Sequence, residues 1–294
     1  MKLELPIRPA APKSWIVLDL ESAVLDDTAH RRYQTMERWT PSDVNQPGRR
    51  GYTRSEDPLL TPRWIFQTIT TAALMLLVEH ADGGIEVARF ATFSAPEHDE
   101  RAVLGGILAE LADTPKDTEL VTWGGAMHDV PLLVAACMRH GLSLPERWRW
   151  LAFGGGDAVR HLDLARVTTG GFRMKPIHMA EVLAAMDLPG KLTAPPFALA
   201  RLIYAGRWSE VAEACEVDVL STALLLARWR RLHDARAGID IVEDRVLRRV
   251  IELRPGSSYA TALKARRDKR FMAKCLTAAD DAVTLAPWLE QDAA

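Results

Sequence analysis

The chain is poor in cysteine and has no long apolar run. Its three cysteines (Cys137, Cys215 and Cys275) are odd in number and far apart, and no two form a Cys-x-x-Cys pair. This argues against a disulfide framework and a zinc site and fits a reducing compartment, so we expect a cytoplasmic protein. The longest uncharged apolar stretch, residues 64–78, is too short and too polar to span a bilayer, and the proline-interrupted start does not resemble a signal peptide. The sequence therefore predicts a protein with no membrane partner.

Charge is nearly balanced over the whole chain but not along it. The formal net charge is −2 for 294 residues. Residues 228–274 carry 14 Lys/Arg and 6 Asp/Glu, a net of +8, which leaves 23 basic and 33 acidic residues, a net of −10, in the remainder. Such a basic segment is typical of a nucleic-acid-binding protein, but also of an arginine-rich helix whose charges are simply solvated. Charge alone leaves both interpretations open.

Hydrophobic patterning predicts an α/β fold. With 48% hydrophobic and 26% charged residues, the composition is that of a folded protein with one large core. Apolar runs predict strands at 15–20, 65–79, 85–92, 119–123 and 161–164, and helical spacing predicts helices at 98–111, 130–140, 177–186 and 208–232. This order predicts a mixed sheet flanked by helices. We expect a long insertion at 22–63, and a boundary near 235 that divides a domain at 14–235 from a basic helical extension at 236–294.

Asp19 and Glu21 are candidate metal ligands at the end of the first predicted strand. Side chains alternate between the faces of a strand, so these two carboxylates project from the same face. Two like charges this close favour a divalent cation between them, and Mg²⁺ and Mn²⁺ prefer carboxylate oxygen. The alternative is that the two acids are simply solvated at the entry to a turn.

Two further acids stand in settings that suit the same site. Asp129 follows the strand at 119–123 and a Gly124-Gly125 turn, at the start of a helix, where it would be either a helix cap or a site residue. Asp218 lies in an Ala/Leu-rich helix, and the residues that share its face (214, 217, 221 and 225) are uncharged. A carboxylate on such a face is costly to bury unless it is paired or bound to a metal.

Taken in order, these motifs resemble the DEDD superfamily of 3′–5′ exonucleases, and more narrowly the predicted exonucleases related to the proofreading domain of family B DNA polymerases. Residues 15–21 are similar to the first motif of that group. Residues 121–133 resemble the second, usually Asn-Gly-x-x-Phe-Asp-Leu-Pro, and residues 214–222 the third, usually Tyr-Cys-x-x-Asp-Val-x-x-Thr. The resemblance covers residues 14–232 and implies an RNase H-like fold, with a mixed β-sheet flanked by helices.

The resemblance also implies a metal-dependent 3′–5′ exonuclease. Its catalytic and metal-binding residues would be Asp19, Glu21, Asp129 and Asp218, which would hold two Mg²⁺ or Mn²⁺ ions. One ion would activate the attacking water and the other would stabilise the departing 3′ oxygen. The implied substrate is nucleic acid with a free 3′ end, with single strands favoured, and the implied product is a nucleoside 5′-monophosphate.

Four other residues stand close to these motifs. Trp123, His128 and Lys191 are the candidate nucleic-acid contacts, although a helix-start histidine or a loop lysine is often only structural. Asp163 would either join the acidic cluster or cap or brace a turn, and we favour the second role.

The motifs depart from the family pattern at the residues that handle the attacking water. The family has Tyr four residues before the last Asp and a sister group has His five residues before it; here these positions are Ala214 and Glu213, of which only Glu213 can accept a proton. Gly124 replaces the usual Asn of the second motif, and His128 replaces its Phe. The departures leave open a catalytically weak or inactive module that binds nucleic acid or protein through its basic residues at 245–274. A third alternative is an RNase H-like endonuclease or nucleotidyl-transfer enzyme that uses the same metals.

Overall fold

The computed structural model describes residues 13–38, 63–80, 82–153, 160–190, 192–193, 196–234 and 238–285. The strands are β1 (Ser14–Ala23), β2 (Thr68–Glu79), β3 (Ile85–Ser94), β4 (Thr118–Thr122) and β5 (His161–Asp163). The helices are α1 (Thr28–Arg38), α2 (Glu100–Ala112), α3 (Asp129–His140), α4 (Leu164–Thr168), α5 (Met179–Ala185), α6 (Pro196–Tyr204), α7 (Trp208–Arg231), α8 (Ile239–Leu253) and α9 (Ser258–Leu285), with 3-10 turns η1 (Trp64–Phe66) and η2 (Glu146–Phe153). In this part of the chain, no helix is long and apolar enough to cross a membrane.

The strands form one five-stranded mixed sheet in the order β3-β2-β1-β4-β5. β2 pairs antiparallel with both β1 and β3, so the predicted hairpin is confirmed, whereas β4 pairs parallel with β1 and β5. This is the RNase H-like arrangement, and the predicted α/β fold with a mixed sheet flanked by helices is confirmed.

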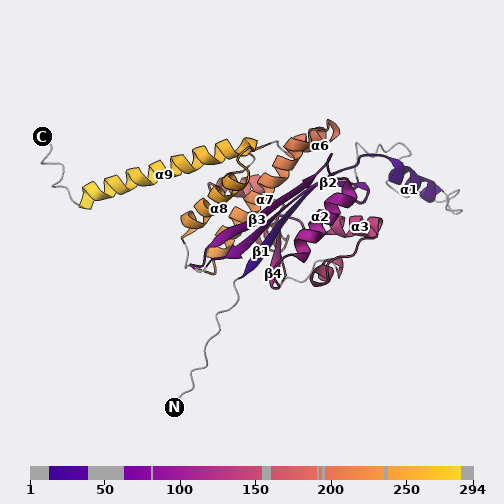
Figure 1. Cartoon of the computed structure of the whole chain (residues 1–294), viewed down its shortest axis with the longest axis horizontal. Helices are drawn as coiled ribbons and strands as arrows, with labels where there is room; N and C mark the ends of the chain where they lie inside the picture. The colour runs from indigo at the N-terminus through magenta and orange to yellow at the C-terminus, as the bar shows by residue number, and fades with distance from the viewer. Residues whose placement is uncertain are drawn as a thin grey trace, which may run out of the picture.

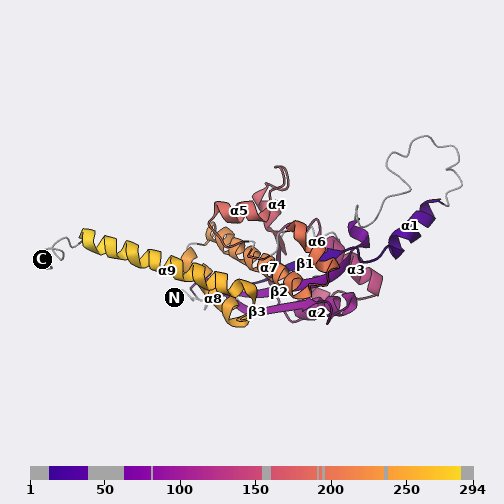
Figure 2. The same cartoon turned by 90° about the horizontal axis from the view of Figure 1, so that it is seen from above.

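The alternation of β1 divides the core into two layers. Ile16, Leu18 and Leu20 pack with α2 and α3 on one face of the sheet, while Trp15 and Val17 pack with α7 and α8 on the other. Figure 2 shows α4, α5 and α6 on one side of the sheet and α2 on the opposite side. Because the period of a strand is two residues, positions 19 and 21 continue the face of Trp15 and Val17, toward α7.

The C-terminal helices contribute to the same core as the sheet. Val246, Leu247 and Val250 of α8 are fully buried and belong to the hydrophobic cluster of β2, β3 and α7. α9 starts against the body and then projects away from it, at the end of the molecule opposite to α1 (Figure 1). The boundary near residue 235 stays a prediction.

The predicted insertion begins later than expected. β1 continues to Ala23, and α1 follows it at Thr28–Arg38, a helix within the range predicted as an insertion. Residues 39–62 lie outside the described part of the chain.

Candidate metal centre

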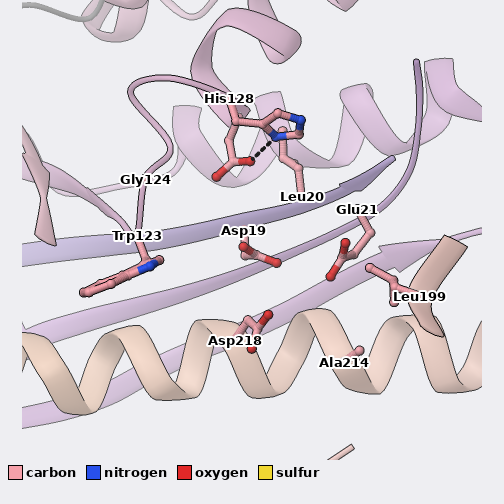
Figure 3. A pocket seen from close by; sticks show the side chains of 10 residues that line it. Asp19, Leu20, Glu21, Trp123, Gly124, His128, Leu199, Ala214 and Asp218 are labelled. Carbon is pink, nitrogen blue, oxygen red and sulfur yellow. Dashed lines mark hydrogen bonds and ion pairs between the residues drawn. The ribbon is translucent and has the colours of Figure 1, made fainter. Parts of the chain in front are cut away.

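One pocket collects the four predicted carboxylates. It has a volume of about 240 Å³ and is lined by Asp19, Leu20, Glu21, Trp123, Gly124, His128, Asp129, Leu199, Ala214 and Asp218. β1 supplies two of the acids, the start of α3 supplies the third and α7 supplies the fourth. Figure 3 shows Asp19 and Glu21 pointing from β1 toward Asp218 on α7. Three segments far apart in the sequence therefore bring their carboxylates to one place.

Asp19 and Glu21 lie near the carboxyl end of β1. Glu21 directly precedes an irregularity in the pairing of β1 with β2. The thiol of Cys215 on α7 donates a hydrogen bond to the backbone carbonyl of Asp19 at 3.4 Å, which ties α7 to this strand. Burial, together with the charges of Asp19 and Glu21, raises the pKa of the Cys215 thiol, so it stays a neutral donor. Ligand atoms of Asp19, Glu21 and Cys215 all lie within 4.8 Å of one another.

Asp129 is positioned by a glycine turn between β4 and α3. Gly124 has φ +76°, a left-handed conformation that glycine and asparagine tolerate best, which accounts for Gly where the family pattern has Asn. A Cβ on Gly125 would lie 2.7 Å from the Thr122 side chain, so the second glycine is needed for close packing. Asp129 is then the first residue of α3, and the preceding position, His128, is its N-cap.

Asp163 holds this turn from β5. Its carboxylate accepts hydrogen bonds from the backbone N–H groups of Gly124 at 2.9 Å and Ala126 at 3.0 Å. It also accepts from the N–H groups of Ala165 and Arg166 at the start of α4. The prediction that Asp163 caps or braces a turn is confirmed. Asp163 is not among the described residues that line the pocket; it holds the turn that leads to Asp129.

Asp218 is positioned by a helix that is pinned to the sheet. Two residues earlier on α7, Glu216 is buried and accepts hydrogen bonds from Thr92 of β3 at 2.6 Å, Arg254 at 2.7 Å and Tyr259 of α9 at 2.7 Å. Successive helical positions differ by 100°, so residues two apart point to well-separated sides. The Glu216 contacts therefore fix the rotation of α7 that turns Asp218 toward β1.

The carboxylates of the pocket repel one another electrostatically. Burial, followed by the charges of Glu21, Asp129 and Asp218, raises the pKa of Asp19 well above its usual range. Burial also raises the pKa of Asp129, an effect partly offset by His128, whose Nδ1 lies 3.1 Å from Oδ1 of Asp129. This hydrogen bond raises the pKa of His128. Clustered carboxylate oxygens of this kind are the ligands that divalent cations such as Mg²⁺ and Mn²⁺ prefer.

Two of the predicted nucleic-acid contacts line the pocket, and the third lies outside the described residues. Trp123 and His128 both line the pocket (Figure 3). Lys191 lies outside the described part of the chain. The contact role of all three residues stays a prediction.

Glu213 does not line the pocket. It accepts hydrogen bonds from the backbone N–H of Ser258 at 3.0 Å and from the Ser258 hydroxyl, and so caps the start of α9. The idea that it takes a proton from the attacking water is therefore not supported by its position.

Leu199 on α6 is a pocket residue that was missed in the sequence. It contributes to the wall beside Glu21 and Ala214 (Figure 3). The apolar spacing of Leu199, Leu202 and Ile203 is a weak helical signal that could have indicated this short helix.

Comparisons with known proteins point in one direction. The model of a family described as predicted 3′–5′ exonucleases related to the exonuclease domain of PolB matches residues 62–252, which include Asp129 and Asp218 but not Asp19 and Glu21. No match is found among curated proteins.

Similar solved structures are more distant. The family B DNA polymerase of the archaeon Pyrobaculum calidifontis is 18% identical with a TM-score of 0.47, over 74% of this chain and 24% of the polymerase. Escherichia coli exonuclease I in complex with a dT13 oligonucleotide is 11% identical with a TM-score of 0.35, over 75% of this chain and 42% of that one. The chain thus spans less than half of these proteins, and at such TM-scores the likeness carries no further argument.

Proposed function

The chain belongs to the family of predicted 3′–5′ exonucleases related to the exonuclease domain of PolB, and from this premise we propose that it hydrolyses nucleic acid from the 3′ end with divalent cations. The observation that carries the proposal is the convergence of Asp19, Glu21, Asp129 and Asp218 on one pocket. The first two acids lie outside the matched residues, yet the fold of β1 brings them to the other two.

In the proposed reaction, water attacks the phosphorus of the 3′-terminal phosphodiester. A new P–O bond forms, the bond from phosphorus to the 3′ oxygen of the preceding nucleotide breaks, and that oxygen takes up a proton. The products are a nucleoside 5′-monophosphate and a strand shorter by one nucleotide. Two Mg²⁺ or Mn²⁺ ions bound by the four carboxylates would supply an activated water and stabilise the leaving oxygen. Trp123 and His128, which line the same pocket, would contact the terminal nucleotide.

Neither position from which this family usually orients the water carries a tyrosine or histidine here. Ala214 stands at the position of the family tyrosine and lines the pocket with a methyl group only. Glu213, at the alternative position, is bonded to Ser258. We therefore expect slow turnover rather than the rate of an enzyme with a complete motif.

The direct test is digestion of a 5′-labelled single strand of DNA or RNA in Mn²⁺. The proposal predicts a ladder that shortens from the 3′ end, with mononucleotides as products, and loss of the ladder in Asp19→Ala and Asp218→Ala. A circular single strand should remain intact, whereas an endonuclease would cut it. An uncut linear strand, with no difference between the wild type and these variants, would contradict the proposal.

The alternative of an inactive binding module finds less support, because much of the basic charge at 228–274 is paired within the chain. The ion pairs join Arg228 and Arg270 to Glu243, Arg230 to Glu79, Arg245 to Asp82, Arg254 to Glu216, Arg267 to Asp244 and Lys274 to Asp240. Salt-sensitive strand binding that persists in an Asp19→Ala/Asp218→Ala double variant, without hydrolysis by the wild type, would favour this module.

A further inference from the structure

Four exposed apolar side chains belong to segments at the end of β1, the strand that carries Asp19 and Glu21. Leu25, Trp64, Ile65 and Tyr204 are exposed by 46%, 47%, 42% and 50%. They come from three separate segments: the stretch after β1, the turn η1 and the last residue of α6. Single exposed apolar residues are ordinary, so what matters here is how their segments are attached to β1.

Hydrogen bonds attach two of these segments to Ser22 and Val24, one and three residues after Glu21. Ser22 donates a hydrogen bond to the side-chain oxygen of Gln67 at 2.6 Å, and Tyr204 donates to the backbone carbonyl of Val24 at 3.1 Å. Trp64 is three residues from Gln67, so their Cα atoms are at most about 11 Å apart. Tyr204 is five residues from the pocket residue Leu199 on the same helix, a rise of about 7.5 Å. Both aromatic residues therefore belong to segments that are hydrogen-bonded to the chain within three residues of Glu21.

A small aromatic cluster supports η1 on α1. The ring of Phe66 lies 5.8 Å from that of Tyr33 and 5.7 Å from that of the buried His30. The guanidinium of Arg63 lies 5.3 Å from the centre of the Tyr33 ring. Phe66 therefore anchors the turn, and Trp64 and Ile65 are left facing solvent. Figure 2 shows α1 projecting from the end of the sheet at which α6 lies.

The pocket itself can hold only the end of a strand. Its volume of about 240 Å³ lies below the usual range for a small-molecule site, and no lysine or arginine is among the described residues that line it. Contacts that hold the remainder of a strand must therefore lie outside the pocket. Proteins that bind single strands without sequence preference combine aromatic side chains, on which bases stack, with basic side chains that contact phosphates.

We propose that Leu25, Arg63, Trp64, Ile65 and Tyr204, which we term the β1-end surface, bind the single strand that leads into the pocket. Bases stack on Trp64 and Tyr204, and the Arg63 guanidinium contacts a phosphate. This inference rests on the proposed function for the direction of the strand, but the binding itself is measured without hydrolysis.

The test measures the affinity of the full chain, in Ca²⁺, for 5′-labelled thymidine oligonucleotides of three and twelve nucleotides. Loss of one stacked base corresponds to about a tenfold change in affinity. We expect Trp64→Ala to weaken binding of the twelve-nucleotide strand about tenfold and to leave the trinucleotide unchanged, and Trp64→Phe to restore most of the loss. Phe271→Ala on α9 and Arg248→Ala on α8, whose side chains are also exposed, are the matched controls for Trp64→Ala and Arg63→Ala.

The outcomes separate the surface from the active site. Equal affinity of the wild type, Trp64→Ala and Arg63→Ala for the long strand would overturn the proposal, even if the wild type digests DNA. So would failure of the wild type to bind any strand, or a protein ligand found on this surface that a strand does not displace. If the wild type binds the strand through Trp64 but shows no nuclease activity, the binding role of the β1-end surface is supported. Only the proposed nuclease function is then contradicted. Photocrosslinking from 5-iodouracil placed a few nucleotides from the 3′ end should label Trp64 or Tyr204, and this readout is independent of any variant that folds poorly.

Discussion

At the scale of single residues, the ionisation of Asp19 is the most informative property. Its pKa is raised by burial and by three neighbouring carboxylates, so its ionisation in the folded, metal-free protein is unfavourable. A carboxyl group whose pKa is higher in the folded state contributes stability at low pH, and this contribution is lost as the pH rises through the folded-state pKa. The metal-free protein should therefore gain stability when this charge is removed.

We predict that Asp19→Asn raises the melting temperature of the metal-free protein at pH 8, because the amide keeps the shape of the carboxyl group without its charge. The difference from the wild type should shrink as the pH falls toward 4. Added Mn²⁺ should raise the melting temperature of the wild type and leave that of Asp19→Asn almost unchanged. Glu97→Gln, at an exposed position, is the control for loss of one negative charge. A lower melting temperature for metal-free Asp19→Asn at pH 8 would contradict this view of the cluster.

Ala214 gives a prediction of gained activity. If the missing hydroxyl limits the rate, Ala214→Tyr should raise the turnover number about a hundredfold, the low end of what a positioned proton-transfer group contributes. Ala214→Phe is the matched control, because it adds the same ring without the hydroxyl. The measurement is the rate of mononucleotide release by variants whose circular dichroism matches that of the wild type. Equal rates for the folded Tyr and Phe variants would show that this position does not limit the reaction.

At the scale of elements, the turn between β4 and α3 sets the position of Asp129. We predict that Gly125→Ala lowers nuclease activity, because its Cβ would meet the Thr122 side chain at 2.7 Å and displace the turn. Gly105→Ala in α2 is the control: a Cβ there meets nothing within 4 Å, and alanine is the better helix former by about 1 kcal/mol. Gly105→Ala should therefore keep activity and gain stability. Full activity in Gly125→Ala would show that the turn is not constrained in this way.

The buried contacts of Glu216 determine how α7 lies on the sheet. We predict that Glu216→Ala lowers the free energy of unfolding by about 3 kcal/mol, because it removes the buried carboxylate and leaves the partly buried Arg254 guanidinium without its ion-pair partner. Glu210→Ala, on the exposed part of the same helix, should cost less than about 1 kcal/mol. Chemical denaturation measures both values. Equal, small effects would mean that the Glu216 network does not hold α7.

The elements show what the sequence could and could not predict. The face shared by Asp19 and Glu21 follows from the period of a strand, and the hairpin and the long helix α7 follow from continuous apolar patterns. α1 was missed because its residues are mostly polar and its apolar contacts come from Phe66, far along the chain. The role of Glu216 was also hidden, because its partners lie 38, 43 and 124 residues away and nothing in the local pattern points to them.

At the scale of the whole molecule, much of the basic charge at residues 228–274 is paired with acidic side chains of the same chain. Arg230, Arg245 and Arg254 pair with acids of β2, of the β2–β3 turn and of α7. Arg230 also lies 4.4 Å from the centre of the Trp15 ring at the start of β1. Arg230 belongs to α7, while the pairs of Arg245 and Arg254 attach α8 and the residue after it to the acidic body, together with the apolar face of α8.

This packing gives a test of the predicted boundary near residue 235. A chain that ends at residue 235 loses Val242, Val246, Leu247 and Val250 from the core, so we expect it to unfold or aggregate. A chain that ends at residue 278 keeps these contacts, and we expect it to melt as the full chain does. Size-exclusion chromatography and thermal melting measure both. A monomeric, cooperatively melting chain of residues 1–235 would show that the two parts are independent domains.

The central claim is that four carboxylates from β1, α3 and α7 form one divalent-cation centre. The most direct test is anomalous diffraction from crystals soaked in Mn²⁺. The account predicts manganese peaks bounded by Asp19, Glu21, Asp129 and Asp218, and their loss in Asp19→Ala crystals. Anomalous maps without a peak among these four residues in the wild type would contradict the claim.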